Sequence, residues 1–502
     1  MSEIKLYERK AFYYETDKMG IVHHSNYIRW FEEARIHFLN EVGYPYAKME
    51  ENGVMIPVLS ARADYKNAVR FDETVLIVLK VEEFNGFKMR ITYRVIGKDS
   101  GELKATGETS HFFTDMNLKP LRTKKTHPDI YKAFADHIGV DFLEEGKRMS
   151  EMMKISAEKA DIRRLGRTLM RNGTLWLGYS LTGVEFDFDG TSLSAELTTD
   201  WVNDEGWKVN FQPYIAVLVN GKLSKRFALN EGTAEYELYR SETAEKVRIR
   251  IVKLSENAFS KVGVISFTAD GTLTGTKASS ERRIEFIGDS ITCAFGIEGR
   301  SASDYFTTST ENPLINYASL TANELGAEYQ LTSWTAIGVY SNSVKDDRTE
   351  PDNAWTMPVI YDYTDKGTDG MLGNEPEKWD FSRFAPQLIV VNLGTNDKDF
   401  TRDIPERTAA FEKCYREFIA HIREKNPQAH IICSLGAMGQ ELCPQVENAV
   451  RTLGNKRITS MRFDVQLEED GIGSEMHPNA VTHRKMADKL IAEIKRLGIF
   501  EE

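Results

Sequence analysis

The sequence predicts three domains in succession: an α+β domain, an all-β sandwich, and an α/β domain built on a parallel sheet. One long amphipathic helix precedes a series of strand-like runs in residues 1–140. Short apolar runs separated by turn signals fill residues 169–280, and apolar runs alternate with amphipathic helices in residues 281–502. Residues 141–168 are charged and helix-prone, so we expect a linker helix there. A length of 502 residues fits about three domains at roughly 150 residues each.

Composition narrows the class of function. The chain has 64 basic and 76 acidic residues, a net charge of −12, which disfavours nucleic acid and anionic membrane surfaces as partners. No run approaches the roughly 20 apolar residues of a membrane span, and the start of the chain lacks the apolar core of a secretory signal. The four cysteines show no C-x-x-C spacing, so we expect neither a disulfide framework nor a metal site. We therefore expect a cytoplasmic protein with reduced thiols.

The first domain is predicted to be a sheet wrapped around one helix. The helix spans residues 26–43, and its apolar side chains recur at helical spacing. They are Tyr27, Trp30, Phe31, Ala34 and Phe38. The β-rich runs that follow lie at residues 54–66, 73–84, 88–98 and 103–115. A long helix followed by consecutive strands is typical of an α+β domain.

The second domain has the pattern of an all-β sandwich. Runs such as GVEFDF and KVRIRIVKL recur at regular spacing. Asp189-Gly190 and Asn220-Gly221 are predicted to be turns between strands, since both dipeptides favour tight turns.

The third domain brings polar residues to the carboxyl ends of parallel strands, where open α/β sheets bind ligands. The runs RRIEFIG, PQLIVVNLG and HIICSLG each end in glycine. Ser290 follows the first run at the start of a helix, where free N–H groups and partial positive charge suit an oxyanion. Asn396 follows the second run within G-T-N-D, and its side chain can donate to the same oxyanion.

A nucleophilic serine needs a base, and two histidines lie in the C-terminal tail. His477 precedes Pro478, which favours the first turn of a helix, so His477 is expected in a loop facing a cleft. His483 falls inside the following helix, and we expect it on the helix surface. Asp289 is interpreted as fixing the turn before Ser290, and Cys293 as a small buried hydrophobe rather than a second nucleophile.

These blocks resemble the SGNH (GDSL-type) hydrolases, most closely carbohydrate esterase family 2, over most of residues 169–502. The resemblance implies an α/β/α hydrolase domain preceded by a jelly-roll-like sandwich. It implies that Ser290 is the nucleophile, His477 the general base and Asn396 an oxyanion donor beside the Ser290 N–H. The glycine of the family's second block falls on Gly338 or on Ala336. The substrates implied are acetylated oligosaccharides.

The sequence departs from the SGNH pattern next to the histidine. The usual aspartate three residues before it is replaced by Ser474, and Glu475 stands two residues before it. Either Glu475 orients the imidazole, or the enzyme works as a Ser–His dyad supported by a backbone carbonyl.

A second constellation precedes the helix of the first domain. Asp17 lies in the loop Thr16-Asp17-Lys18-Met19-Gly20, where an acid can attack a thioester or activate water. Residues 5–140 resemble the hotdog-fold acyl-CoA thioesterases of the 4-hydroxybenzoyl-CoA type. The resemblance implies that Asp17 is the catalytic acid and that His24 and Tyr14 line the substrate site. It also implies a homo-oligomer, a dimer or tetramer assembled through the hotdog domain.

The combined expectation is a bifunctional hydrolase without a bound cofactor, acting on acetylated oligosaccharides and on acyl-CoA. In one alternative, the hotdog domain is only an oligomerisation scaffold and Asp17 caps a turn. In another, the sandwich is a carbohydrate-binding module whose tryptophans are exposed rather than in the core. These tryptophans are Trp176, Trp201 and Trp207.

Overall fold

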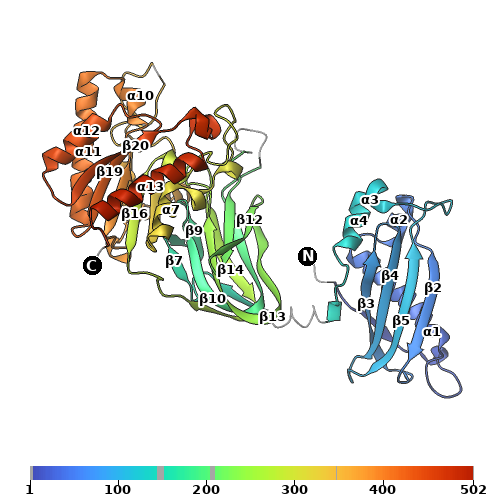
Figure 1. The fold of residues 1–502 in the computed structure, drawn as a ribbon. Coiled ribbons are helices and arrows are strands. Elements are labelled where there is room, and N and C mark those ends of the chain that lie inside the picture. The colour runs from blue at the N-terminus through green and yellow to red at the C-terminus, as the bar shows by residue number, and fades with distance from the viewer. Residues whose placement is uncertain (1–3, 144–151, 204–209, 346, 501–502) are drawn as a thin grey trace. The chain divides into compact units, whose positions relative to one another are not determined.

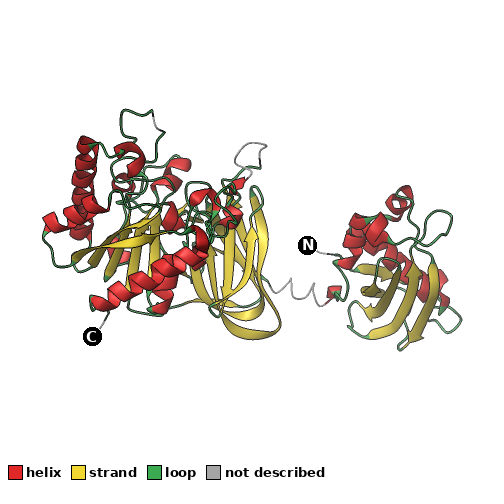
Figure 2. Cartoon of the chain, turned by 45° about the horizontal axis from the view of Figure 1, so that its top comes forward, coloured by secondary structure: helices red, strands yellow, loops and turns green. Residues whose placement is uncertain are grey.

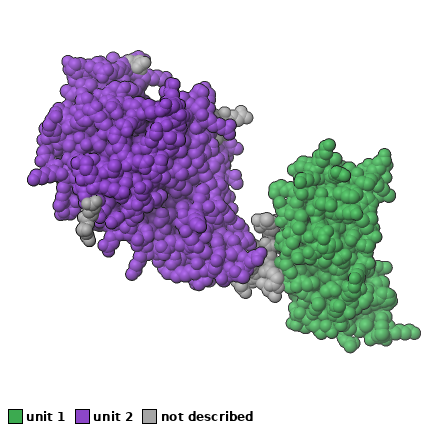
Figure 3. Space-filling model, in the orientation of Figure 1, with its two compact units in different colours: residues 1–152 green, residues 153–502 purple. Residues whose placement is uncertain are grey.

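The structure is a computed structural model that describes residues 4–143, 152–203, 210–345 and 347–500. The chain forms two compact units, residues 1–152 and residues 153–502 (Figure 3). Among the described residues, no helix is both long and apolar enough to cross a membrane.

The first unit is a five-stranded antiparallel sheet with a long helix, as predicted. Its strands run in the order β1-β3-β4-β5-β2. They are β1 (Tyr7–Lys10), β2 (Val58–Tyr65), β3 (Thr74–Phe84), β4 (Lys88–Gly97) and β5 (Leu103–Phe112). The helices are α1 (Ser25–Glu41), α2 (Tyr46–Glu51), α3 (Thr123–Thr126) and α4 (Pro128–Ala135) (Figure 1).

Helix α1 packs its apolar stripe against the sheet. Trp30, Phe31 and Phe38 are buried, as their helical spacing predicts. Gly107 of β5 makes this close packing possible, because a Cβ there would lie 2.2 Å from the Phe31 ring. The Phe31 ring also stacks on Tyr93 of β4, with centroids 4.5 Å apart.

The second unit begins with a curled antiparallel β-sandwich. Its main path runs β12-β11-β13-β10-β14-β9-β8, and β6, β7 and β15 pair onto it. The strands are β6 (Met153–Ser156), β7 (Arg163–Leu165), β8 (Leu169–Arg171), β9 (Thr174–Leu177), β10 (Gly183–Thr199), β11 (Tyr214–Val219), β12 (Lys222–Ala228), β13 (Thr233–Lys253), β14 (Val262–Ala269) and β15 (Thr272–Gly275).

Two sequence predictions in this region are wrong. Residues 153–168 do not form a linker helix: β6 pairs with β14 and β7 with β10, so sheet pairing overrides the local helix propensity. The rest of the predicted linker includes residues 144–151, which lie outside the described residues. Asp189-Gly190 is not a turn, because both flanking runs pair with β13 and the chain crosses this point with a register shift.

Other predictions for the sandwich are confirmed. Asn220 and Gly221 turn the chain between β11 and β12, and both have the positive φ that a tight hairpin turn needs, 50° and 78°. Trp176 and Trp201 are buried, which supports their interpretation as core residues. Trp207 lies outside the described residues.

The last part of the chain is a five-stranded parallel sheet in the order β17-β16-β18-β19-β20, with helices on both faces (Figure 2). The strands are β16 (Arg283–Gly288), β17 (Glu328–Ser333), β18 (Leu388–Asn392), β19 (His430–Ala437) and β20 (Ile458–Val465). The helices are α6 (Ser290–Cys293), α7 (Tyr317–Glu324), α8 (Met357–Ile360), α9 (Lys366–Met371), α10 (Asp397–Thr401), α11 (Pro405–Lys425), α12 (Cys443–Leu453) and α13 (Ala480–Arg496).

Alternation along β18 divides this core into two layers. Leu388 and Val390 pack into the cluster that includes α7 and α13, whereas Ile389 and Val391 pack into the cluster that includes α11 and α12. A strand buried on both faces is therefore apolar along its whole length, which explains the run LIVV in the sequence.

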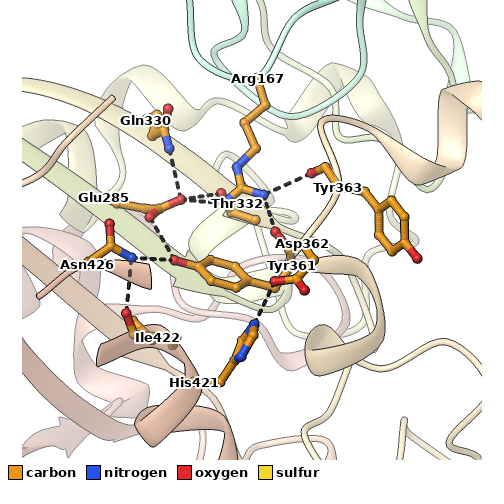
Figure 4. Close-up of polar contacts among 10 residues, drawn as sticks. All are labelled: Arg167, Glu285, Gln330, Thr332, Tyr361, Asp362, Tyr363, His421, Ile422 and Asn426. Carbon is orange, nitrogen blue, oxygen red and sulfur yellow. Dashed lines mark hydrogen bonds and ion pairs between the residues drawn. The ribbon is translucent and has the colours of Figure 1, made fainter. Parts of the chain in front are cut away.

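A buried arginine joins the sandwich to the parallel sheet (Figure 4). Arg167, in the loop after β7, forms an ion pair with Glu285 of β16 at 3.0 Å, and both side chains are buried. Arg167 also donates to the carbonyl oxygens of Tyr361 and Tyr363, and its guanidinium lies 4.8 Å from the Tyr361 ring centroid. Removing one partner of such a buried pair costs about 3–5 kcal/mol, so this contact fixes the sandwich against the α/β domain.

Candidate active site

The turn after β16 presents Ser290 at the carboxyl end of the sheet. Asp289 caps α6 by accepting a hydrogen bond from the Ile291 N–H at 3.0 Å. Burial raises the pKa of Asp289 to about 7. Asp289 thus has the turn-fixing position expected from the sequence, and Ser290 begins the helix beside it.

His477 contacts Ser290 directly. Its Nε2 lies 2.9 Å from Ser290 Oγ, and its Nδ1 lies 2.9 Å from the carbonyl oxygen of Glu475. Because a carbonyl oxygen only accepts, Nδ1 carries the proton of the neutral ring and Nε2 is free to accept from the serine hydroxyl. This is the arrangement of a nucleophile and its general base.

Glu475 orients the histidine through its main chain and not through its carboxylate. Glu475 and Met476 both have left-handed backbone conformations, with φ of 50° and 66°. This turn directs the Glu475 carbonyl toward Nδ1, while the Glu475 carboxylate accepts from the Phe306 N–H at 3.0 Å. Of the two arrangements that the sequence left open, the structure has the Ser–His dyad with a carbonyl.

Two glycines allow the histidine loop to approach the segment after Ser290. The N–H of Ser474 donates to the carbonyl of Gly296 at 3.0 Å. A Cβ at Gly299 would lie 2.3 Å from the Ser474 nitrogen, and a Cβ at Gly296 would lie 2.7 Å from the Ser474 Cβ. Only glycine therefore permits this contact, which sets the distance between nucleophile and base.

The surroundings of His477 favour its neutral form. Its ring lies 4.3 Å from the Phe295 ring, which stacks on Phe306 with centroids 3.6 Å apart. Burial lowers the pKa of His477, and the hydrogen bond to the Glu475 carbonyl opposes this effect only in part. The ring is consequently available as a base at neutral pH.

Three groups that follow the carboxyl ends of β16, β17 and β18 are candidate donors to an oxyanion. Within the described residues, the backbone N–H groups of Ser290 and Ala336 have no acceptor. The Asn396 side-chain amide donates one N–H to the Ile337 carbonyl at 2.9 Å. Its second N–H has no acceptor among the described residues. Ala336 is exposed and has a φ of 61°, a left-handed conformation that glycine usually occupies.

Gly338 does not have the position of a free donor. Its N–H donates to the Asn342 side chain at 3.1 Å, and a Cβ on it would lie 1.8 Å from the Ser341 carbonyl oxygen. Gly338 therefore allows close packing of the loop, and the structure favours Ala336, the other position considered, as the second backbone donor.

Asp397 holds the loop after β17, a position that the sequence did not single out. Its buried carboxylate accepts from the N–H groups of Val339, Tyr340 and Ser341 at 2.7 to 3.1 Å. Burial raises its pKa to about 6 although these donors oppose the shift. Asp397 thereby ties the loop after β17 to Asn396, and its place in G-T-N-D was the available signal.

Two neighbouring side chains have structural positions. Cys293 is buried, as expected, and burial raises the pKa of its thiol well above the usual range, so it is a poor nucleophile. The expectation for His483 is wrong: it is fully buried, and its Nδ1 accepts from the Tyr317 N–H at 3.1 Å. The amphipathic pattern of α13 places it on the face that packs against α7.

In the first unit, Asp17 lies in a tight loop before α1. Its carboxylate accepts from the Met19 N–H at 2.7 Å, and its carbonyl accepts from the Gly20 N–H at 3.0 Å. Tyr14 is 77% exposed and stacks on Phe12. His24 is exposed and precedes α1, and no hydrogen bond joins it to Asp17 or Tyr14 among the described residues.

The buried acid of this loop is Glu15, which the sequence reasoning did not single out. Its carboxylate accepts from the Arg9 guanidinium at 2.7 Å, the Trp30 indole at 2.9 Å and the Phe12 N–H at 2.8 Å. Burial alone would raise the pKa of Glu15, but these donors lower it below the usual range. Glu15 anchors the Asp17 loop to α1.

Family models match all three domains. Residues 13–138 match the thioesterase-like superfamily, residues 164–276 the carbohydrate esterase 2 N-terminal domain, and residues 286–485 the GDSL-like lipase/acylhydrolase family. The chain joins a thioesterase-like hotdog domain to a family 2 carbohydrate esterase. It belongs to both families, each over its own part.

Relatives of the esterase part include two curated proteins and one solved structure. "Cellulase/esterase CelE" of Acetivibrio thermocellus is 33% identical over 64% of this chain, which spans only 37% of that protein's length. "Acetylxylan esterase / glucomannan deacetylase" of Cellvibrio japonicus is 28% identical over 70% of this chain and 92% of its own. A family two carbohydrate esterase from Clostridium thermocellum in complex with cellohexaose superposes with a TM-score of 0.58 at 29% identity, over 67% of this chain and 98% of its own.

The first domain has its own relative. "Putative acyl-CoA thioesterase YneP" of Bacillus subtilis is 36% identical over 25% of this chain and 92% of its own. The two halves of the chain therefore resemble separate proteins.

The lowered pKa of His477 predicts the pH dependence of ester hydrolysis. Burial disfavours the imidazolium, so the proton that inactivates the base binds only below the ordinary histidine value of 6.5. We expect kcat/KM for 4-nitrophenyl acetate to be constant above pH 7 and to fall on acidification with a midpoint below 6.5. A midpoint at or above 6.5, measured over a range in which the protein stays folded, contradicts this assignment.

Proposed function

We propose that the chain is a bifunctional hydrolase, a serine esterase that removes acetyl groups from carbohydrates fused to an acyl-CoA thioesterase. The observation that carries the esterase half is the 2.9 Å contact between Ser290 Oγ and His477 Nε2 at the carboxyl end of a parallel sheet. The names of the relatives support a sugar ester as the substrate, and acetylated oligosaccharide is the class that fits them.

The geometry supports a two-step acyl transfer. Ser290 Oγ attacks the acetyl carbonyl while its proton passes to His477 Nε2. The oxyanion then accepts from the Ser290 and Ala336 N–H groups and from Asn396. His477 returns the proton to the sugar oxygen as the C–O bond breaks, which leaves acetyl-Ser290. A water molecule then attacks this acyl-enzyme while His477 takes its proton. His477 passes this proton to Ser290 Oγ as the acyl–oxygen bond breaks, and acetate and free Ser290 result.

For the first domain we propose hydrolysis of acyl-CoA with Asp17 as the acid that attacks the thioester or activates water. Asp17 is half-buried in a loop fixed by Glu15, and the exposed Tyr14 and His24 lie within seven residues of it along the chain. The alternative is a domain that serves only for assembly, with Asp17 as a turn former, and its hydrogen bond to the Met19 N–H fits that alternative as well.

We also propose that the hotdog domain assembles the protein into a dimer or tetramer. Strand β2 is an edge of its sheet, pairs only with β5 among the described strands, and exposes Val58, Leu59 and Tyr65. An exposed apolar edge strand is a surface for pairing with another chain. A cytoplasmic location fits acyl-CoA substrates and the unpaired cysteines, and cell fractionation tests it.

Two substitutions separate the proposed activities. Ser290→Ala removes the nucleophile, so ester hydrolysis should fall by at least about a thousandfold with acyl-CoA hydrolysis unchanged. Asp17→Asn keeps the shape of the side chain but removes its charge, so it should abolish only acyl-CoA hydrolysis. Assays with 4-nitrophenyl acetate, acetylated xylan and a panel of acyl-CoA chains measure both. If the wild-type protein hydrolyses no acyl-CoA in the panel, the assembly-only alternative holds.

The assembly proposal predicts the effect of a charge on β2. Leu59→Lys should lower the mass of the full-length protein in multi-angle light scattering. The interface would bury the lysine charge against apolar side chains, which costs free energy and disfavours assembly. The matched control is Leu223→Lys, since Leu223 is also 54% exposed but lies on β12 of the sandwich. An unchanged mass for Leu59→Lys, or a monomeric wild-type protein, contradicts the proposal.

A further inference from the structure

A glutamate of the sandwich contacts the oxyanion loop of the α/β domain. Glu256 follows β13 and is fully buried. Its Oε2 accepts from the Thr335 N–H at 2.6 Å. Thr335 directly precedes Ala336, whose N–H has no acceptor among the described residues and is the proposed second backbone donor to the oxyanion. The sandwich therefore holds the Trp334–Thr335 peptide unit, which directly precedes the unit that carries the Ala336 N–H.

The surroundings of Glu256 hold its carboxylate in place. The Glu256 N–H donates to Glu311 Oε2 at 3.2 Å, so the two acids lie close together. The buried Lys253 ammonium donates to three backbone carbonyl oxygens, those of Gly178 at 2.9 Å, Glu256 at 3.0 Å and Ser255. Burial raises the pKa of Glu256 to about 7.

We propose that Glu256 is a positioning residue of the esterase, which aims the Ala336 N–H at the oxyanion by holding the Thr335 N–H. A residue other than glycine at a φ of 61° is strained, so the left-handed conformation of Ala336 needs support from its neighbours. Asp397 holds the following residues of the loop, Val339 to Ser341, but does not contact Thr335. The Ser343 N–H holds the Ala336 carbonyl at 2.9 Å, and Glu256 adds a restraint from the sandwich on the N-terminal side of Ala336. This inference rests on the proposed esterase function.

The role assigned to Glu256 changes the interpretation of the sandwich. A module that only delivers glycans would affect KM when altered. A sandwich that positions an oxyanion donor affects kcat, because the oxyanion exists only in the transition state and the tetrahedral intermediate.

The test compares three variants of the full chain with 4-nitrophenyl acetate. Glu256→Ala removes the acceptor, and we expect kcat to fall about tenfold or more with KM within about twofold, since losing an oxyanion donor outright costs roughly 10²–10³. Glu256→Gln keeps an oxygen that accepts from the Thr335 N–H, so it should retain kcat within about threefold. The matched control is Glu185→Gln, a buried sandwich carboxylate that pairs with Arg163 and Arg250, and it should behave as wild type.

Several outcomes overturn the inference. The inference is wrong if Glu256→Ala folds and keeps the wild-type kcat. It is also wrong if Glu256→Gln loses as much kcat as Glu256→Ala. If Glu256→Ala does not fold, Glu256→Met fills the space without an acceptor and carries the same expectation. Glu256, Cys293 and Glu311 could hold a cation, because their ligand atoms lie within 4.8 Å of one another. Mass spectrometry of the wild-type protein tests for one bound divalent metal ion per chain. If such an ion is found and is lost in Glu256→Gln, the role of Glu256 is metal binding and not positioning.

Failure of the proposed function gives a different result. In that case wild-type ester hydrolysis is absent or survives Ser290→Ala. When wild-type activity depends on Ser290 but not on Glu256, only the positioning role is wrong.

Discussion

The hydrogen bond between His477 Nδ1 and the Glu475 carbonyl is the contact on which the esterase site depends. It fixes the tautomer that leaves Nε2 facing Ser290, and among the described residues no carboxylate reaches Nδ1. A backbone carbonyl orients the ring without the full negative charge that an aspartate would add. Burial lowers the pKa of His477, and the hydrogen bond to the carbonyl opposes this effect only in part. The left-handed turn at Glu475 is what brings this carbonyl into place.

The same site needs contacts from outside the α/β sheet. Arg167 and Glu285 lock the sandwich against β16, the strand that ends at the nucleophile turn. Glu256 reaches the loop after the neighbouring strand β17. Because both buried contacts cross from the sandwich, the esterase is one structure made of two domains. The hotdog domain is a separate compact unit, and Ser290 and His477 both lie in the other unit.

The sequence alone predicts features that depend on neighbouring residues, such as strand ends and the buried face of a helix. Ser290 and Asn396 follow apolar runs that end in glycine, so their positions after strand ends could be predicted. His477 lies in a loop before α13 as expected, although Pro478 precedes the N-cap Asn479 and is not in the first turn of the helix. The buried stripe of α1 followed from its helical spacing. The prediction of a turn at Asp189-Gly190 is wrong because pairing with the distant strand β13 continues β10 through these two residues. The roles of Glu256 and of the Glu475 carbonyl depend on tertiary contacts and on backbone angles, which residue identity does not reveal.

The main chain of Glu475, and not its carboxylate, orients His477, the proposed catalytic base. The most direct measurement is kcat/KM for 4-nitrophenyl acetate in Glu475→Gln beside His477→Ala, with folding checked by circular dichroism. Glutamine retains both the backbone carbonyl and an oxygen for the Phe306 N–H, so Glu475→Gln should stay within about threefold of wild type, while His477→Ala loses at least about a thousandfold. A loss in Glu475→Gln as large as that in His477→Ala would contradict the account.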